Sequence, residues 1–182
     1  LPLYFLWLYS TIRRTIARVH PGPQRRVVVI AVIDLGSKRE LAVATTHMES
    51  YLEDGPMRAK QLDQIFGLLE PHRHAMLLGD LNFGDGEEPE TAHLDKRYRD
   101  VWSALKGKAP GFTWNRERSP MAHRGSFKGE KSRRLDRILI RSDALSPKTV
   151  RIIGDRPVSA ARSEVFPSDH FGLEATLSVT LP

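Results

Sequence analysis

The 182-residue chain contains no cysteine, which excludes disulfides and thiolate metal sites. Any bound metal must therefore be held by oxygen or imidazole ligands. No Asp or Glu precedes Val27, so the first part of the chain offers no carboxylate ligand. Long apolar runs are also missing. The run LPLYFLWL at 1–8 is too short to cross a bilayer, and no basic region precedes it as in a signal peptide. We interpret it as the start of a buried strand or helix. Because the chain begins with Leu1, we expect it to be part of a longer protein.

The composition is that of a soluble globular protein, with 40% hydrophobic and 27% charged residues. The length suffices for one domain with a hydrophobic core. The formal net charge of +6 favours polyanionic partners, namely nucleic acid, phosphoinositides or an anionic membrane surface, without choosing among them.

The first half of the chain predicts strands around one helix. The run VVVIAVIDL at 27–35 is β-branched and continuous, as in a buried central strand, and pairs as a hairpin with a second strand at 41–46. Apolar residues at helical spacing predict a helix at 56–69, which Pro71 ends. The short apolar run at 75–78 predicts a buried strand.

The second half contains more strands than helices. We expect a polar loop at 83–99, a short helix at 100–105, a short strand at 111–115 and an exposed, mobile loop at 119–134. Three further strands are predicted at 135–141, 150–153 and 172–181. This pattern is typical of α+β layers, or of a sandwich of sheets with helices outside.

Compact polar residues follow strands or lie at loop edges in four places, which is where rigid scaffolds present catalytic groups. These stretches are residues 46–50 (THMES), 79–82 (GDLN), 134–137 (RLDR) and 167–170 (PSDH).

Asp80 and Asn82 follow a buried strand directly. Side chains at i and i+2 point to the same side of an extended chain, so a carboxylate and an amide would face one site. The carboxylate could activate water or bind a metal, and the amide could donate to a phosphate oxygen. The alternative is an Asx turn that closes the strand.

Two histidines, at 170 and 47, are candidate donors to a phosphate group. His170 could donate to a non-bridging phosphate oxygen, and the adjacent Asp169 could orient an imidazole or bind a cation. His47 and Ser50 are further donors to phosphate. The alternatives are a capped turn for Asp169, an exposed His170, a satisfied histidine at 47 and a local backbone hydrogen bond for Ser50.

Two charged groups suggest support for the site. Arg58 and Gln61 lie three apart on one helix face and could buttress the site, or could face solvent. Asp136 lies between Arg134 and Arg137 within an apolar strand, and we interpret it as a structural, ion-paired carboxylate.

Aromatic and basic residues suggest contacts with nucleic acid. Trp114 could stack on a base, although a core position is the commoner fate of tryptophan. Lys128, Lys131 and Arg133 lie in a basic loop that could contact phosphates, or could simply be solvated.

Taken in order, these motifs resemble the endonuclease/exonuclease/phosphatase superfamily over most of the chain from Val27 onward. The matching residues are Thr46-His47-x-Glu49-Ser50, Arg58-x-x-Gln61, Gly79-Asp80-x-Asn82, Asp100-x-Trp102, Thr113-Trp114, Asp136-Arg137-Ile138 and Ser168-Asp169-His170. Within this superfamily the runs at 47–50, 100–102, 112–114 and 166–173 are most similar to the tyrosyl-DNA phosphodiesterase 2 family. Lipid phosphodiesterases share much of the same frame.

The resemblance implies a four-layer α/β sandwich, with two packed mixed sheets and helices outside, in an N-terminally truncated form. It also implies in-line attack of water on a phosphodiester. Asp80 would position or deprotonate the water, and Asn82 would hold the water and the phosphate. His170 would stabilise the pentacovalent transition state, while His47 and Ser50 would bind the phosphate.

The resemblance further implies a Mg²⁺ cofactor, with Mn²⁺ as a substitute, and Asp169 as a support for His170 or a metal ligand. The superfamily carries its main metal ligand in a Gln-Glu motif soon after the first strand. No Gln-Glu pair occurs here, so we divide the chain into a poorly matched segment at 1–26 and the superfamily-type domain at 27–182. A catalytically inactive binding module is therefore one alternative to an active hydrolase, and a lipid or inositol phosphate phosphodiesterase is another.

The expected substrate is DNA, at 5′ ends that include 5′-phosphotyrosyl linkages, and a role in DNA repair follows from this. The resemblance also implies a nuclear, intracellular location. We expect a monomer with no obligate protein partner and no membrane span.

Overall fold

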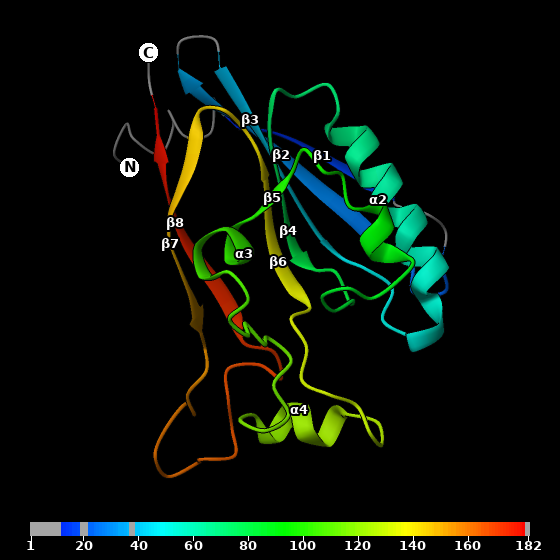
Figure 1. Ribbon diagram of the computed structural model, residues 1–182, viewed down its shortest axis with the longest axis vertical. Coiled ribbons are helices and arrows are strands. Elements are labelled where there is room, and N and C mark those ends of the chain that lie inside the picture. Colours follow the sequence, from blue (N-terminus) through cyan, green and yellow to red (C-terminus); the bar gives the residue numbers. More distant parts are fainter. Residues whose placement is uncertain (1–11, 19–21, 37–38, 181–182) are drawn as a thin grey trace, which may run out of the picture.

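The computed structural model describes residues 12–18, 22–36 and 39–180 of the chain. The apolar run at 1–8 lies outside these residues. Figure 1 shows the strands in two sheets, with loops and a short helix gathered beyond one end of the strands. Among the described residues, no helix is long and apolar enough to cross a membrane.

In the described part of the chain, the larger sheet has six strands in the order β1-β2-β3-β4-β6-β5. They are β1 (Ile12–Arg18), β2 (Val27–Gly36), β3 (Arg39–His47), β4 (His74–Asp80), β6 (Asp136–Arg141) and β5 (Arg99–Asp100). β2 and β3 form the predicted antiparallel hairpin, whereas β3 and β4 run parallel. No strand was predicted at 12–18, where β1 lies, and β1 pairs antiparallel with β2.

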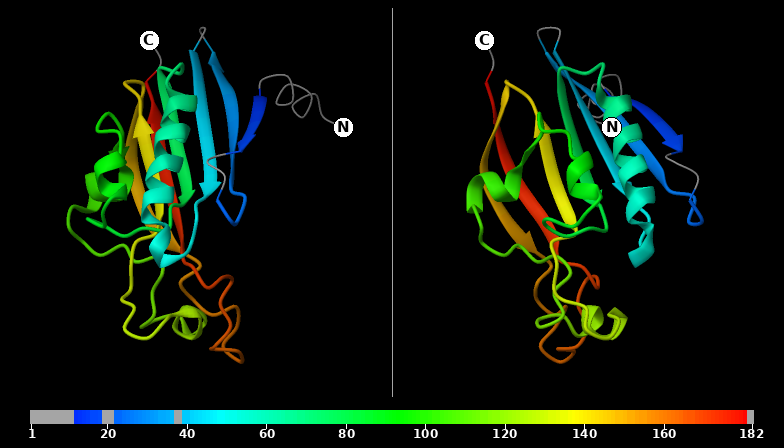
Figure 2. Two further views of the ribbon diagram at one scale, coloured as in Figure 1. Left: turned by 90° about the vertical axis from the view of Figure 1, so that its right-hand side faces the viewer. Right: turned by 45° about the vertical axis from the view of Figure 1, so that its right-hand side comes forward.

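The second sheet consists of β7 (Leu145–Ile153) and β8 (Gly172–Val179), which pair antiparallel. Figure 2 shows helix α2 (Gly55–Leu69) on one face of the larger sheet and β7–β8 on the other. The predicted arrangement of two packed sheets with helices outside is confirmed.

β4 packs on both of its faces because alternate side chains point in opposite directions. Ala75 and Leu77 belong to the apolar cluster that includes Leu62 and Ile65 of α2. Met76 belongs to the cluster between the two sheets. This double burial explains why the strand reads as a continuous apolar run rather than an alternating one.

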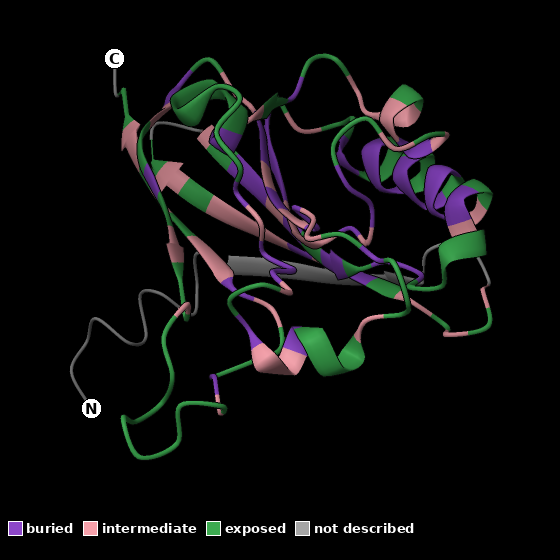
Figure 3. Ribbon diagram, turned by 60° about the horizontal axis from the view of Figure 1, so that its bottom comes forward, coloured by how far each residue is buried: buried purple, intermediate pink, exposed green. Residues whose placement is uncertain are grey.

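Helix α2 confirms the helical spacing seen in the sequence. Figure 3 shows its buried side facing the sheet and its exposed side facing outward. The helix carries Pro56 in its first turn, where the missing N–H leaves no hydrogen bond unmade.

Two expectations for the second half are wrong. The expected strand at 111–115 is reduced to a single bridge between Trp114 and Arg133. The expected loop at 119–134 contains helix α4 (Pro120–Gly125), which the side chain of Ser119 caps by accepting from the backbone N–H of Ala122. The remaining short elements are η1 (Leu52–Asp54), η2 (Glu90–His93) and α3 (Val101–Lys106).

Candidate functional site

Three strand ends meet at one edge of the larger sheet. β3 and β4 are parallel, so their last residues, His47 and Asp80, are register partners. β6 runs antiparallel to β4, so its first residue, Asp136, lies opposite Asp80. The register therefore places an imidazole and two carboxylates side by side on three adjacent strands.

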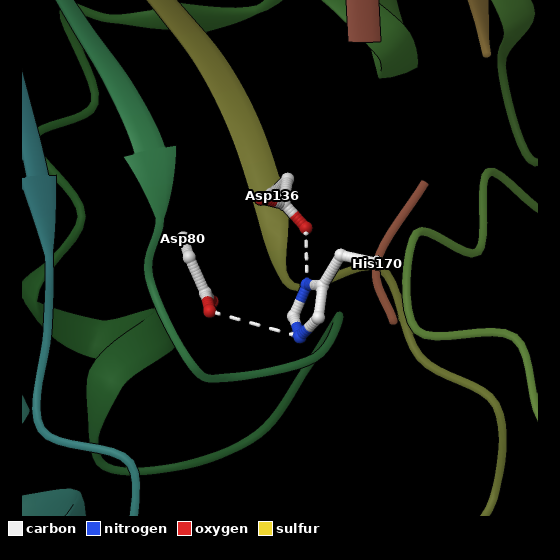
Figure 4. Close-up of side chains that lie close together, drawn as sticks. All are labelled: Asp80, Asp136 and His170. Carbon is white, nitrogen blue, oxygen red and sulfur yellow. Dashed lines mark hydrogen bonds and ion pairs between the residues drawn. The ribbon is translucent and has the colours of Figure 1, made fainter. Parts of the chain in front are cut away.

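The two oxygens of Asp80 have different partners. Oδ2 lies 3.5 Å from Nε2 of His47. The same oxygen lies 3.8 Å from Nε2 of His170 (Figure 4). Oδ1 accepts the backbone N–H of Asn82 at 2.9 Å, which closes the Asx turn. The turn and the convergence of polar groups are thus both present, because each uses its own oxygen.

Burial raises the pKa of Asp80 above its ordinary value, and the neighbouring Asp136 carboxylate adds to this effect against the opposing charge of His170. Loss of solvent around the half-exposed imidazole lowers the pKa of His47, in spite of the attraction of Asp80. These directions favour a carboxylate able to accept a proton beside a neutral imidazole.

His170 is oriented from two sides. Its Nδ1 lies 2.8 Å from Oδ2 of Asp136, so Nδ1–H donates to the carboxylate and Nε2 points toward Asp80 (Figure 4). Its ring centroid lies 5.0 Å from that of Trp114. Burial alone would lower the pKa of His170, but the hydrogen bond to Asp136 and the charge of Asp80 outweigh it, and the pKa is raised.

The expectation that Asp136 pairs with its neighbouring arginines is wrong. Arg134 and Arg137 bind Asp85 and Asp100 instead. This leaves the Asp136 carboxylate for His170. The Asp136-Arg137-Ile138 match to the superfamily was the one sequence signal that could have indicated this role.

Asp169 lines the same cleft but is exposed, and its Oδ1 accepts the hydroxyl of Ser168 at 3.1 Å. The imidazole contact expected of Asp169 is made by Asp136. Asp169 adds to the raised pKa of His170 only through its charge.

Asn82 adopts a left-handed backbone conformation, with φ of 56°. Its Nδ2 donates to the carbonyl of Met48 at 2.9 Å, which ties the loop after β4 to the end of β3. The amide therefore lies in the cleft with one of its hydrogens engaged.

Ser50 has partners that no local pattern predicted. Gln24 donates from Nε2 to the Ser50 hydroxyl at 2.8 Å, and its Oε1 accepts the Ser50 backbone N–H at 3.0 Å. Arg26 approaches the same hydroxyl at 3.5 Å. The residues just before β2 thus contact the site, although we had assigned them to the poorly matched segment.

One cleft of about 650 Å³ is lined by both polar and apolar side chains. His47, Asp80, Asp136 and His170 are among its lining residues. Tyr51, Leu52 and Phe127 also line it, and their side chains are exposed.

Comparison with known proteins finds curated relatives that share one name. No family model matches the sequence. The chain is 31% identical over 160 residues to tyrosyl-DNA phosphodiesterase 2 of Mus musculus, a match that covers 82% of this chain and 40% of that protein. The corresponding protein of Gallus gallus is 25% identical over 180 residues, covering 94% and 47%. The chain thus spans less than half the length of these curated relatives.

Solved structures share the fold. The structure of TDP2 from D. rerio, complexed with a single-stranded DNA product, superposes with a TM-score of 0.76 at 23% identity, covering 94% of this chain and 70% of that one. An endonuclease/exonuclease/phosphatase family protein from Bacteroides thetaiotaomicron superposes with a TM-score of 0.63 at 16% identity, covering 94% and 67%. The fold expected from the resemblance to the endonuclease/exonuclease/phosphatase superfamily is confirmed.

The described residues include one group that could hold a metal ion. Among the described residues, Asp80, Asp136 and His170 each offer a ligand atom within 4.8 Å of the others. Two carboxylates beside an open cleft with room for water match the preference of Mg²⁺ for oxygen ligands and retained waters. The donor set therefore fits a hydrated divalent cation.

The four candidate DNA contacts differ in their availability. Trp114 is 8% exposed and lies against His170, so little of its ring faces solvent. Arg133 pairs with Glu87 and Glu130. Lys128 and Lys131 are exposed. Stacking by Trp114 and phosphate binding by the three basic residues remain predictions.

Proposed function

We propose that this chain is the greater part of the catalytic domain of a divalent-metal-dependent phosphodiesterase that acts at 5′ ends of DNA. The observation that carries the proposal is that the Asp80 carboxylate lies within 3.8 Å of two imidazoles, with all three groups lining one cleft. Such a group can take a proton from water while its neighbours bind the phosphate.

In the proposed reaction, Asp80 lies close to both imidazoles, orients the attacking water and accepts its proton. The water oxygen bonds to phosphorus while the P–O bond to the leaving oxygen breaks. His170 donates from Nε2 to a non-bridging oxygen as negative charge grows there. Its protonated form is maintained by Asp136. His47, Ser50 and Asn82, which line the same cleft, bind the remaining phosphate oxygens.

A divalent cation such as Mg²⁺, with Mn²⁺ as a substitute, would be held by Asp80 and Asp136, with His170 beside it. When bound, it would neutralise charge on the phosphate oxygens. Asp169 lies in the same cleft and is a further candidate ligand.

DNA is favoured as the substrate by three observations. The relatives are named for tyrosyl-DNA, the net charge is +6, and exposed lysines lie in the segment that borders the cleft. Tyr51 and Phe127, which are exposed and also line the cleft, suit a substrate with a planar organic group next to the phosphate.

The test is hydrolysis of a 5′-tyrosyl single-stranded oligonucleotide by the purified chain, compared with sphingomyelin and an inositol phosphate. We expect cleavage of the tyrosyl-DNA that requires Mg²⁺ or Mn²⁺ and stops with a chelator. Preference for the lipid would instead indicate the lipid branch of the superfamily. No turnover, together with no rise in melting temperature on adding Mg²⁺, would indicate a non-catalytic binding module.

A further inference from the structure

A buried ion pair lies next to the site without taking part in the chemistry described above. Nε of Arg58, on α2, lies 2.6 Å from Oε1 of Glu90, on η2. The two side chains are 4% and 2% exposed. A buried pair of this kind costs desolvation energy, so it is poor evidence of a purely stabilising role.

Arg58 also binds the backbone that follows β3. Its Nη1 donates to the carbonyl of Glu49 at 3.0 Å and to that of Tyr51 at 2.6 Å. One helical turn later, Gln61 accepts the backbone N–H of Glu49 at 3.2 Å. Side chains on one face of α2 therefore bind both carbonyl and N–H groups of this backbone.

The anchored backbone continues directly from the residues that face the cleft. We call residues 47–50 the His47–Ser50 segment, and both of its end residues line the cleft. Within it, the Met48 carbonyl accepts the side-chain amide of Asn82. A shift of this segment would move three groups assigned to phosphate binding.

Glu90 binds Arg58 from helix η2 and does not itself line the cleft. Helix η2 packs closely on the start of α2. A Cβ placed on Gly55 would lie 3.0 Å from Pro89 and 3.4 Å from the Glu90 carboxylate. Without Glu90, the guanidinium of Arg58 would be a buried charge with only neutral carbonyls as partners, which is unfavourable.

We propose that Glu90, acting through Arg58, is a positioning residue for phosphodiester hydrolysis because it fixes the His47–Ser50 segment against the phosphate. This inference rests on the proposed function. It assigns the buried pair a role in the geometry of the site in addition to its role in stability.

Two single variants begin the test. Arg58→Lys keeps the positive charge but cannot reach the carboxylate and both carbonyls at once, because it lacks the guanidinium fork. Glu90→Gln keeps the shape but removes the charge. In both, we expect faster amide hydrogen exchange in residues 48–52 and a fall in kcat/KM on the order of 10²-fold.

A double variant separates positioning from stability. Arg58→Met with Glu90→Leu replaces the ion pair by apolar groups of similar volume. Such a replacement of both partners usually avoids the loss of stability that follows when one partner is removed. We expect the melting temperature to recover toward the wild-type value, while hydrogen exchange in residues 48–52 stays fast and kcat/KM stays low. Recovery of kcat/KM along with stability would overturn the inference.

Arg141 provides a matched control. It binds Glu70 and the carbonyls of Leu69 and His72 with a similar fork, at the opposite end of the strands from Asp80. Arg141→Lys should lower stability and leave kcat/KM unchanged. A wild-type chain without turnover would count against the proposed function, whereas normal kcat/KM in the double variant would count against Glu90 alone.

Discussion

The Asp80 side chain has a structural role in a backbone turn and a chemical role in the site. Oδ1 closes the turn that ends β4, and Oδ2 faces the two imidazoles. A residue that replaces the carboxylate but keeps one acceptor oxygen should therefore separate the two roles.

Asp80→Asn should abolish turnover while leaving the melting temperature nearly unchanged. The amide oxygen can still accept the Asn82 N–H, but an amide cannot accept a proton from water. Turnover assays and thermal denaturation would check this. Asp80→Ala, which also loses the turn, is the control that should lower stability, and a similar loss in Asp80→Asn would make Asp80 chiefly a turn residue.

Asp136→Asn should lower the pKa of His170, because it removes both the hydrogen bond and the charge that raise it. Titration of the imidazole by NMR, with a chelator present, would measure the shift. An unchanged pKa would contradict the role given to Asp136.

The raised pKa of His170 also makes the stability of the fold depend on pH. A raised folded-state pKa means that protonated His170 stabilises the fold fully below the ordinary histidine pKa of about 6.5. This contribution is lost as pH rises through the folded-state value. Asp136→Asn should therefore lose more stability on the acidic side of this window than on the basic side.

At the scale of elements, the close pairing of β3 with β4 depends on Gly79. Its φ of 131° is a conformation that other residues avoid, and a Cβ there would overlap the carbonyl oxygen of Thr46. This close approach sets the path of the chain just before Asp80.

Gly79→Ala should destabilise the fold by about 2 kcal/mol or more, because backbone atoms must move to admit the methyl group. Chemical denaturation would measure the change. Gly67→Ala is the matched control: it lies exposed in α2 with open space around it, and should stabilise the protein by about 0.5–1 kcal/mol. Equal effects of both changes would contradict the close-approach argument.

Elements with a periodic pattern were predictable from the sequence, and elements held by distant contacts were not. The apolar spacing of α2 and the continuous run of β4 reflect burial that local residues encode. Helix α4 has few apolar residues and lies in a basic, Gly- and Ser-containing stretch, so its local sequence read as a loop.

The convergence of His47 and Asp80 was predictable because both residues sit at strand ends. The contact of Gln24 with Ser50 spans 26 residues, and that of Asp136 with His170 spans 34. No spacing rule reaches that far, because such contacts depend on how the sheet and its loops fold back. The partners of Arg134 were misjudged for the same reason.

At the scale of the whole molecule, only some of the cationic side chains behind the net charge of +6 are open to a ligand. Arg58, Arg134 and Arg137 are buried and paired with carboxylates. Exposed lysines in the segment that borders the cleft are therefore better placed to hold a polyanion than the total charge alone suggests.

Replacing Lys128 and Lys131 by Gln should weaken binding of a single-stranded oligonucleotide and reduce its dependence on salt. Each lost phosphate contact should lower the slope of log K against log salt by about 0.7. Fluorescence anisotropy with the Asp80→Asn protein would measure this without cleavage. Lys148→Gln, on β7, is the control, and an identical slope change there would indicate non-specific charge effects.

The contact between Trp114 and His170 gives the site a built-in optical signal. Indole emission is quenched by a protonated imidazole at short range, and these rings lie 5.0 Å apart. With the chain's other two tryptophans, Trp7 and Trp102, replaced by phenylalanine, the remaining emission would follow the proton on His170 as ligands arrive. The same ring that holds the imidazole in place would thus make the charge state of the site readable by fluorescence during a single turnover.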